Sequence, residues 1–415
     1  MRLLQLNTYH YRRGGSDVVF LEHDRLFREH GWETAVLAMR HPSNEPSPWE
    51  EYFVDEIELG RRYPLHRRAL MAAKVVYSWE ARAKLRRLLR VFRPDVVHAH
   101  CIYHHLSPSV LPLLSEEGIP VVLTAHDLKL ACPAYKMLNR GGVCERCRDG
   151  NLLNVVRYRC VHGSLALSAL IALESAVHRA LGLYRQHLAR VVVPSRFFAD
   201  KLAEWGWPRE RLAYIPNWVA AAAFPPSYRP GDYFLYVGRL AEEKGVRTLL
   251  RAAALAAVPV RVVGAGPDGA SLRAAVGPGQ DVRFLGYRSG EELWREVGGA
   301  RAVVMPSEWY ENAPMAVLEA YACGKPVVGA RIGGVPELVP SAEVGRLFAS
   351  GDAESLACCL EELAGLPDAA VEAMGRAGRR FVEETFTRDR YWESMAALYA
   401  GLLGAGSNRA AAVGG

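Results

Sequence analysis

Short apolar runs alternate with stretches of helical periodicity along the chain. In the first half, the runs that fit strands are residues 2–6, 34–38, 96–99, 121–124 and 190–193. The patterns that fit helices between them are residues 17–30, 81–91 and 164–186. Strands that alternate with helices are typical of an α/β domain with a parallel sheet. The pattern therefore predicts one such domain in the first half of the chain.

A second series of the same kind follows a proline-rich break at residues 208–227. Its strands are predicted at residues 233–237, 261–263, 282–285, 302–305 and 326–329. Its helices are predicted at residues 245–256, 290–297 and 314–323. Two successive α/β series indicate two similar lobes with a cleft between them.

These patterns predict a first domain over residues 1–205, a second over 206–385, and a last helix within 386–403. The length agrees, because 415 residues exceed what one hydrophobic core usually serves and favour two domains of about 200 residues each. Residues 404–415 are rich in small side chains that give little surface to pack, so we expect a disordered tail.

The composition is that of an ordinary globular protein, with half of the residues apolar and 23% charged. The first apolar run spans only a few residues, which favours a short strand over a signal peptide. The longest apolar stretch, residues 164–184, contains Glu174, His178 and Arg179, which indicates an amphipathic helix rather than a membrane span. We therefore expect a cytoplasmic protein whose eight cysteines are thiols or ligands rather than disulfides.

Positive charge is concentrated in the first half. Residues 1–190 carry 27 Lys and Arg against 19 Asp and Glu, a net charge of +8, whereas the rest carries 24 against 26. Residues 61–93 contain eleven basic side chains and one acid, with apolar residues interleaved at helical spacing. Such a basic amphipathic helix either exposes its basic face to solvent or attaches the protein to the surface of an anionic membrane. There each basic residue contributes on the order of 1 kcal/mol to the binding free energy. Nucleic acid binding is disfavoured, since no nucleic-acid motif accompanies the charge.

Gly14 and Gly15 stand between the first predicted strand and the helix that follows it. A glycine pair at this place lets the backbone approach a ligand and directs free N–H groups at an anion. Tight turns use the same pair, so the pattern alone leaves both interpretations open.

Arg239 and Lys244 follow the first strand of the second lobe, at the end of the strand where ligands bind in open α/β sheets. Two cations there would hold a diphosphate and neutralise it as a leaving group. An isolated pair of this kind is equally typical of an exposed loop.

The segment from Glu311 to Gly324 is the sharpest local signal. Pro314 suits the first turn of a helix and Gly324 its end, so the helix is well bounded. Glu311 then lies just before the positive end of the helix, beside N–H groups that could take a phosphate. Glu319 lies more than a turn inside among apolar residues, and its carboxylate could accept the paired hydroxyls of a ribose.

Together these motifs resemble glycosyltransferase family 4. The resemblance rests on the Glu-x7-Glu pair Glu311 and Glu319, the Ala-Cys-Gly-Lys-Pro-Val-Val after it, Gly-Gly-Val-Pro-Glu at residues 333–337 and Val-Gly-Arg-Leu…Lys-Gly before it. It extends over residues 1–403. It implies a GT-B fold, in which two Rossmann-like domains face each other across a cleft and the last helix crosses back to the first domain. It also implies a retaining, metal-independent enzyme that moves a sugar from a nucleotide sugar to an acceptor hydroxyl, with the donor phosphate as the group that takes the acceptor proton.

The resemblance also implies roles for the matching residues. Arg239 and Lys244 would grip the donor diphosphate, Glu311 would contact the transferred sugar, and Glu319 would hold the nucleotide ribose. His126, which follows a strand in Thr-Ala-His-Asp, would face the donor sugar. The remaining donor contacts are assigned to Gly14, Gly15, Gly238, Gly264, Gly266, Asn312, Ala313, Met315 and Ala316.

The chain departs from the family pattern in one place. Many members have Gly-Phe-Gly after the first glutamate, where this chain has Asn312, Ala313 and Pro314. Because Pro314 has no N–H, the phosphate contacts would shift to Met315 and Ala316. The departure leaves the identity of the donor open.

We expect a UDP- or GDP-sugar donor and a glycan, lipid-linked or small-molecule acceptor, in cell-surface or lipid-linked glycan synthesis. Two other classes stay open. One is a different GT-B enzyme, such as a sugar-nucleotide epimerase. The other is a non-catalytic nucleotide-sugar-binding scaffold that the basic helix anchors at a membrane.

Four of the eight cysteines fall within 29 residues, as Cys-x11-Cys-x2-Cys-x12-Cys. Four thiolates could close a tetrahedral structural zinc site and hold a long loop, residues 130–162, that has little core of its own. His162 could replace one ligand, and four unrelated thiols are the alternative. The resemblance implies that catalysis itself needs no cofactor. The predicted ligands are Cys132, Cys144, Cys147 and Cys160.

Four histidines lie near a strand end of the first lobe, where we expect mostly cleft wall or surface. His100 is the best candidate among them for the acceptor site. The four are His98, His100, His104 and His105.

Overall fold

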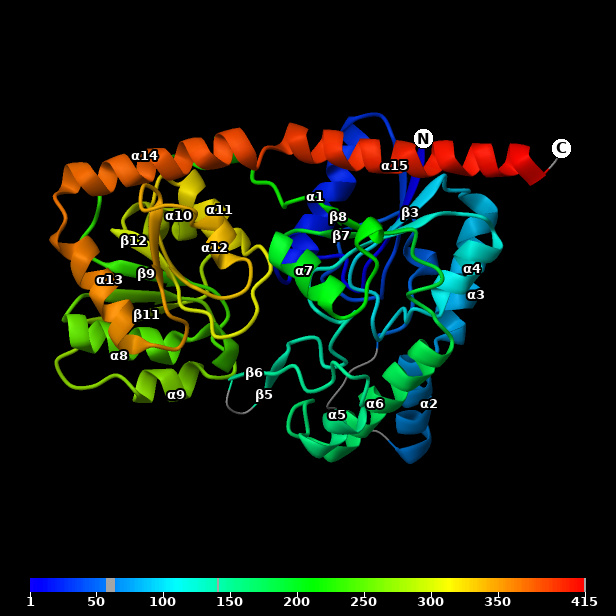
Figure 1. Ribbon diagram of the computed structural model, residues 1–415, viewed down its shortest axis with the longest axis horizontal. Coiled ribbons are helices and arrows are strands. Elements are labelled where there is room, and N and C mark those ends of the chain that lie inside the picture. The colour runs from blue at the N-terminus through cyan, green and yellow to red at the C-terminus, as the bar shows by residue number, and fades with distance from the viewer. Residues whose placement is uncertain (57–63, 140–141, 414–415) are drawn as a thin grey trace.

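The computed structural model describes residues 1–56, 64–139 and 142–413, without the side chains of 65–68 and 405–413. It consists of two α/β domains side by side, and two successive helices, α14 (Asp368–Thr385) and α15 (Arg388–Val413), run along one side of both (Figure 1). The prediction of two Rossmann-like lobes is confirmed.

The first domain is built on a parallel sheet in the order β2-β1-β3-β4-β7-β8. Every residue of β3 and β4 is buried, because helices cover both faces of the sheet. The strands are β1 (Arg2–Leu6), β2 (Glu33–Leu37), β3 (Val96–Ala99), β4 (Val121–Thr124), β7 (Arg190–Val193) and β8 (Leu212–Tyr214).

The helices of this domain are α1 (Gly15–Glu29), η1 (Glu50–Tyr52), α2 (Leu65–Val76), α3 (Trp79–Val91), α4 (Val110–Glu116), α6 (Leu165–Ala180), α7 (Arg196–Glu204) and η2 (Arg209–Arg211). Between β4 and α6 lies a long loop, residues 130–162, of which 140 and 141 are outside the described residues. It holds the antiparallel strands β5 (Leu138–Asn139) and β6 (Gly142–Val143) and the short helix α5 (Leu153–Arg157).

The second domain repeats the design with a parallel sheet in the order β11-β10-β9-β12-β13-β14. Its strands are β9 (Phe234–Val237), β10 (Val260–Val263), β11 (Val282–Gly286), β12 (Ala302–Met305), β13 (Val327–Ala330) and β14 (Gly345–Phe348). Its helices are η3 (Ala221–Ala223), η4 (Glu242–Lys244), α8 (Val246–Ala256), α9 (Gly269–Ala274), α10 (Gly290–Gly298), α11 (Met315–Ala322), α12 (Val335–Leu338), α13 (Ala353–Gly365) and α14.

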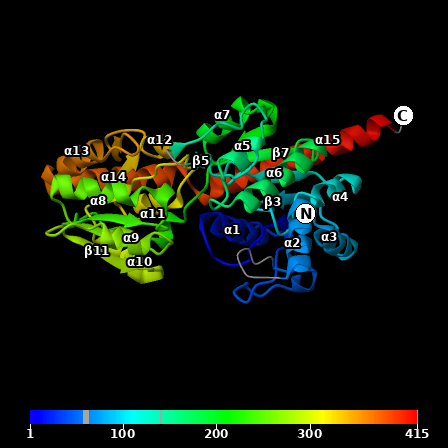
Figure 2. The ribbon, with the colours of Figure 1, turned by 90° about the horizontal axis from the view of Figure 1, so that it is seen from below.

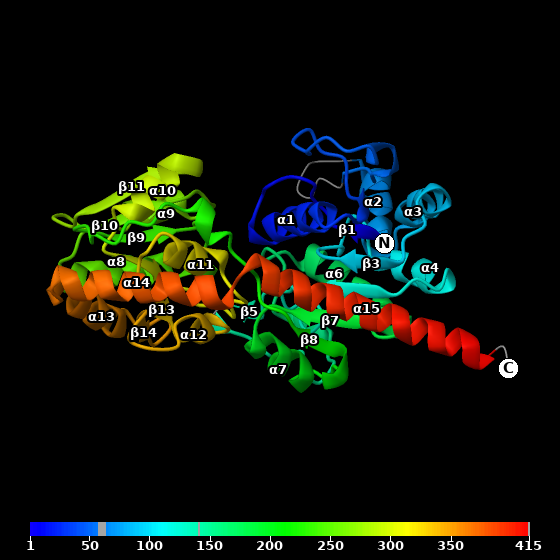
Figure 3. The same ribbon diagram turned by 90° about the horizontal axis from the view of Figure 1, so that it is seen from above.

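In each sheet the strand order reverses beside the first strand, between β1 and β3 and between β9 and β12. Open parallel sheets bind ligands at these points, outside the carboxyl ends of the strands. Helix α1, which follows β1, lies on the side of the first domain that faces the second (Figures 2 and 3). The fold therefore brings the two ligand-binding edges towards one another.

Helix α15 crosses back onto the first domain, as the resemblance implied (Figure 3). Tyr391, Met395 and Tyr399 of this helix are buried in one cluster with Leu3 of β1 and Phe27 of α1. The last helix is thus a part of the first domain's core.

Two boundaries differ from the prediction. Strand β8 pairs with β7, so the first domain continues past residue 205. A three-residue strand is too short to show a period, which is why the pattern missed it. The backbone of α15 extends to Val413, into the segment where the sequence predicts a disordered tail.

Within the basic stretch 61–93, residues 65–76 form α2 and residues 79–91 form α3, while residues 61–63, with Arg61 and Arg62, lie outside the described residues. The apolar side of α3 is already used, because Leu85, Leu88 and Leu89 are buried in the first domain's core. This side cannot also enter a membrane while the domain is folded. Among the described residues, no helix is long and apolar enough to cross a membrane.

Candidate active site

Lys244 and Glu311 form the central ion pair of the cleft. Lys244 Nζ donates to Glu311 Oε1 at 2.6 Å, and Ser307 Oγ donates to the same oxygen at 2.7 Å. Burial alone would raise the pKa of Glu311, but the Lys244 ammonium and the hydrogen bond from Ser307 lower it below its ordinary value. Glu311 is therefore a carboxylate at neutral pH.

Glu319 has the opposite environment. It lies in α11 against apolar side chains, including Val237 and Trp294, and lines a small cavity there. Burial raises the pKa of Glu319 to about 7. A half-protonated carboxyl group beside a cavity is suited to bind hydroxyl groups.

Two predicted donor-site glycines, Gly264 and Gly266, have a packing reason to be glycine. A Cβ on Gly264, at φ +137°, would lie 1.8 Å from the carbonyl oxygen of Gly238, and a Cβ on Gly266 would lie 2.2 Å from that of Leu240. The loops after β9 and β10 therefore touch through their backbones. Exposed Arg239 lies in the first of these loops, between Gly238 and Leu240.

The N-termini of α1 and α11 meet across the cleft. A Cβ on Gly15, the first residue of α1, would lie 3.9 Å from Cγ of Met315, the first residue of α11. First-turn N–H groups have no partner within their own helix. Gly14, Gly15, Met315 and Ala316 therefore lie at one place where two positive helix ends converge.

His126 and His100 are in direct contact. His100 Nδ1 and His126 Nε2 are 2.8 Å apart, and the two rings stack with centroids 5.1 Å apart. Burial lowers the pKa of His126 to about 4, so its ring is neutral at pH 7. The prediction of His100 as an acceptor contact was wrong, because its side chain is fully buried behind His126. The sequence showed that His100 follows a strand. It did not show that this strand, β3, lies in the middle of the sheet, where its surroundings are buried.

His98 and His105 are also buried rather than cleft wall, whereas His104 is partly exposed. His98 bonds Thr124 Oγ1 at 2.7 Å and the hydroxyl of Tyr399. His104 lies 3.7 Å from the buried carboxylate of Glu174. His105 is buried too.

Asn312 links the two domains instead of pointing freely into a donor site. Its Nδ2 donates to the carbonyl oxygens of Ala125 at 2.8 Å and His126 at 3.4 Å, and its Oδ1 accepts from Ser195 Oγ at 2.9 Å. The contact joins the chain segments of Glu311 and His126. Neighbouring Ala313 is held through its carbonyl oxygen by Asn217 at 3.3 Å.

The four clustered cysteines lie in the long loop between β4 and α6. Burial raises the pKa of Cys147, and the nearby thiols of Cys144 and Cys160 raise it further. Burial likewise raises the pKa of Cys132, to which Cys147 and Cys160 add. Yet the described residues include no group of three or more His, Cys, Asp or Glu side chains placed to hold a metal ion.

Tyr135 is a cleft residue that the sequence did not point to. Burial raises the pKa of its hydroxyl, and Asp127 and Arg239 are among the charged groups that act on it. It has φ +55°, a conformation that non-glycine residues adopt rarely and often at functional sites. Only that backbone angle, which no sequence pattern encodes, marks it.

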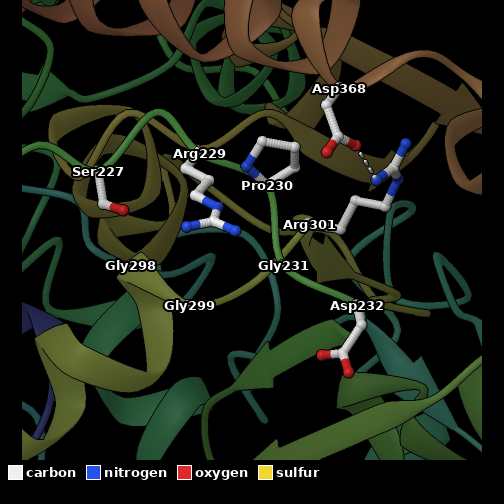
Figure 4. A pocket seen from close by; sticks show the side chains of 9 residues that line it. All are labelled: Ser227, Arg229, Pro230, Gly231, Asp232, Gly298, Gly299, Arg301 and Asp368. Atoms are coloured by element: carbon white, nitrogen blue, oxygen red, sulfur yellow. Dashed lines mark hydrogen bonds and ion pairs between the residues drawn. The ribbon is translucent and has the colours of Figure 1, made fainter.

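A larger hollow of about 650 Å³ lies elsewhere, at the amino ends of β9 and β12 (Figure 4). Arg301 and Asp368, which line it, bond each other at 3.0 Å. None of the residues assigned to the candidate site lines this hollow, so it is separate from the site.

Two family models match the chain. The "Glycosyl transferase 4-like domain" matches residues 14–218, and "Glycosyl transferases group 1" matches residues 224–381. Among characterised relatives, a D-inositol 3-phosphate glycosyltransferase of Actinosynnema mirum is 30% identical over 331 residues, which are 74% of this chain and 72% of the relative. A glycogen synthase of Mycobacterium tuberculosis is 28% identical over 329 residues, 74% of this chain and 68% of the relative.

Solved structures show the same fold. Sucrose-phosphate synthase from Thermosynechococcus elongatus superposes with a TM-score of 0.70 at 21% identity, covering 97% of this chain and 99% of the other. Anabaena HepE, solved in complex with UDP and glucose, superposes with a TM-score of 0.67 at 18% identity, covering 97% and 100%. At these identities the likeness concerns the GT-B fold alone.

Proposed function

The chain belongs to the group 1 glycosyltransferases of family 4, and from this premise we propose that it is a retaining, metal-independent transferase that uses a nucleotide-sugar donor. The observation that carries the proposal is the meeting of two helix N-termini, at Gly15 and Met315, across the same cleft as the Lys244–Glu311 pair. Converging N–H groups and a lysine suit a diphosphate.

The donor diphosphate would lie between α1 and α11. The free N–H groups of Met315 and Ala316 would bind its oxygens, and Arg239 and Lys244 would neutralise its charge. These groups do the work that a divalent cation does in other transferases, because they stabilise the negative charge that builds up as the nucleotide diphosphate leaves. Glu319 would accept hydrogen bonds from the two ribose hydroxyls.

The reaction follows from these positions. The bond between the sugar's anomeric carbon and the β-phosphate oxygen breaks, and the acceptor oxygen bonds to the same face of that carbon. The departing phosphate oxygen takes the acceptor proton. Glu311 would orient the sugar hydroxyls as an acceptor of hydrogen bonds. His126, neutral at pH 7, would contact the sugar from the first domain.

HepE, whose fold this chain shares, has been solved with UDP and with UDP-glucose. This makes UDP-sugars the first donors to test, with GDP-sugars next. The relatives named above act on different acceptors, so a glycan, a lipid-linked sugar and a small molecule are all acceptors to include.

The test is donor profiling of the purified protein with UDP-, GDP- and ADP-sugars, following nucleotide diphosphate release and thermal shift. We expect one donor to stabilise the protein and to be consumed in the presence of acceptor. Glu311→Ala and Lys244→Ala should abolish turnover, whereas Glu361→Ala, which removes an exposed carboxylate on α13, should not.

Other outcomes point to other classes. Donor conversion without acceptor would indicate an epimerase. Donor binding without turnover, unchanged in Lys244→Ala, would indicate a scaffold. No response to any donor from a folded protein would reject the proposal.

Membrane attachment is a second proposal, and it would be electrostatic only, since the apolar side of α3 is buried. Arg86, Arg90 and Arg93 are exposed and would supply the charge. Sedimentation with anionic vesicles should show binding that falls with salt and with Arg86→Gln/Arg90→Gln. Equal binding to neutral vesicles would contradict it.

The predicted zinc site stays a proposal that metal analysis tests. About one Zn²⁺ per chain in protein purified without chelator, lost in Cys147→Ser, would support it. Folded protein free of metal would reject it.

A further inference from the structure

The cysteine-rich loop, residues 130–162, reaches across to the second domain at two points. Lys136 Nζ donates to Glu243 Oε1 at 3.0 Å, and Tyr310 OH donates to Glu145 Oε1 at 2.8 Å. Glu243 directly precedes Lys244, and Tyr310 directly precedes Glu311. Each contact therefore ends one residue from a member of the central ion pair.

The two contacted segments are also tied to one another. The backbone N–H of Glu308 donates to the carbonyl oxygen of Glu243 at 2.9 Å, and a Cβ on Gly245 would lie 1.8 Å from the carbonyl oxygen of Pro306. A displacement of either segment is thus passed to the other. The loop holds both from outside the second domain.

Lys136 is presented by a strained turn. The residues on either side of it, Tyr135 and Met137, have φ of +55° and +45°. Such angles cost non-glycine residues free energy and persist where the surrounding structure holds them. Met137 is fully buried in the first domain's core, which anchors the turn.

Glu145 has an anchor of its own. Lys201 of α7 donates to its Oε1 at 2.9 Å, and the same ammonium lies 5.3 Å from the centre of the Tyr310 ring. The ring of Phe197 packs on Tyr310 with centroids 4.8 Å apart. Tyr310 is therefore inserted between the loop and α7 of the first domain.

Resting on the proposed function, we infer that the loop is an interdomain clamp in which Lys136 and Glu145 are positioning residues for the Lys244–Glu311 pair. They touch neither donor nor acceptor. When the domains are closed, they hold the two segments that carry Lys244 and Glu311 in place. When the domains open, their hydrogen bonds to these segments break. The loop thereby couples closure of the cleft to completion of the site.

Two mutant cycles test the clamp, one with Lys136→Met and Glu243→Gln, the other with Glu145→Gln and Tyr310→Phe. Each single change should lower kcat about tenfold, the effect of one charge-assisted hydrogen bond, with less change in the donor KM. Each double variant should be no slower than its worse single variant, because the second partner has nothing left to hold. Asp149→Asn removes an exposed charge from the same loop and should leave kcat unchanged.

A second measurement does not depend on turnover. Hydrogen exchange of residues 241–245 and 306–311 should be faster in Lys136→Met and Tyr310→Phe than in the wild type and Asp149→Asn. Unchanged exchange in the variants would overturn the clamp. If the wild type is active, unchanged kcat values in the single variants, or losses of kcat that add fully in the double variants, would overturn it too. An inactive wild type with accelerated exchange in the variants would reject the proposed function and keep the clamp.

Discussion

Glu311 and Glu319 lie eight residues apart, and their environments shift their pKa values in opposite directions. Glu311 is held as a carboxylate by Lys244, whereas burial without a neighbouring cation raises the pKa of Glu319 to about 7. Environments that separate two like groups in this way assign them different roles. Glu311 is a permanent anion beside the cleft, and Glu319 changes its charge near neutral pH.

Nucleotide binding should therefore depend on the charge of Glu319. Ribose hydroxyls donate to the carboxylate, so binding favours the ionised form and strengthens as pH rises through 7. We expect the Kd for the cognate nucleoside diphosphate to fall about tenfold between pH 6 and pH 8, as the ionised fraction rises. Calorimetric titration of Glu319→Gln supplies the control, since this variant lacks the ionisation of Glu319 and keeps that of the phosphate and of every other group. An identical pH dependence in both proteins would refute the assignment.

The His100–His126 bond predicts a second effect at this scale. His100→Phe keeps a ring in the stack but removes the nitrogen 2.8 Å from His126 Nε2. The freed His126 ring can then rotate, so we expect kcat to fall about tenfold with little change in unfolding temperature. Steady-state kinetics on variants checked by circular dichroism measure this. If the kcat of His100→Phe equals that of the wild type, the orientation of the His126 ring does not depend on its hydrogen bond to His100.

At the scale of elements, the candidate site is assembled from loops at strand ends that touch through their backbones. The loop after β9 carries Arg239 and Lys244, and the loop after β10 fixes its path because Gly264 lies against Gly238. The loop after β12 carries Glu311. Precision at the site therefore depends on glycines that need not touch any ligand.

Gly264→Ala tests this packing. The added Cβ would meet the Gly238 carbonyl oxygen at 1.8 Å, so we expect a loss of about 2–4 kcal/mol in the free energy of unfolding and a weaker hold on the donor. Gly286→Ala is the matched control, because Gly286 also has positive φ, +72°, but has nothing within 4 Å of a Cβ. It should cost only about 1 kcal/mol. Urea unfolding of the two variants compares them, and equal losses would contradict the packing argument.

At the scale of the whole molecule, the two domains are joined by directed polar contacts as well as by the chain. Glu337 of α12 accepts the backbone N–H groups of Arg196 at 2.9 Å and Phe197 at 2.7 Å, and so caps α7 of the other domain. Asn312 bonds Ala125 across the same cleft. Polar interfaces of this kind can open and close, which a cycle of substrate entry and product release requires.

The crossover helix is the exception, because its contact is a core. A chain ending at Phe386 would lose Tyr391 and Tyr399, the hydroxyl partners of buried His23 and His98, and would expose apolar side chains of the first domain. We expect this protein to be insoluble or to unfold without cooperativity. A chain ending at Gly404 keeps these contacts and should unfold like the full chain. Soluble yield and thermal unfolding of the two shortened chains test this expectation. A cooperative unfolding transition in the chain that ends at Phe386 would contradict the role of α15 in the first domain's core.

The sequence by itself determined the two α/β domains and most of their strands. Apolar runs such as Val121–Thr124 mark buried parallel strands, and Pro314 and Gly324 bound the helix after Glu311. These signals are local, because they depend on which neighbours in the chain a residue has. They also selected Lys244 and Glu311, which the structure brings to 2.6 Å across 67 residues.

Tertiary structure decided what lies behind and across the cleft. That His100 supports His126, that Asn312 joins the domains, and that Lys136 and Glu145 reach Glu243 and Tyr310 depends on residues far apart in the chain. No periodicity encodes such pairs. They arise only when two sheets and a connecting loop are packed together, because a hydrogen bond needs its partners within about 3 Å and the chain alone does not fix that distance.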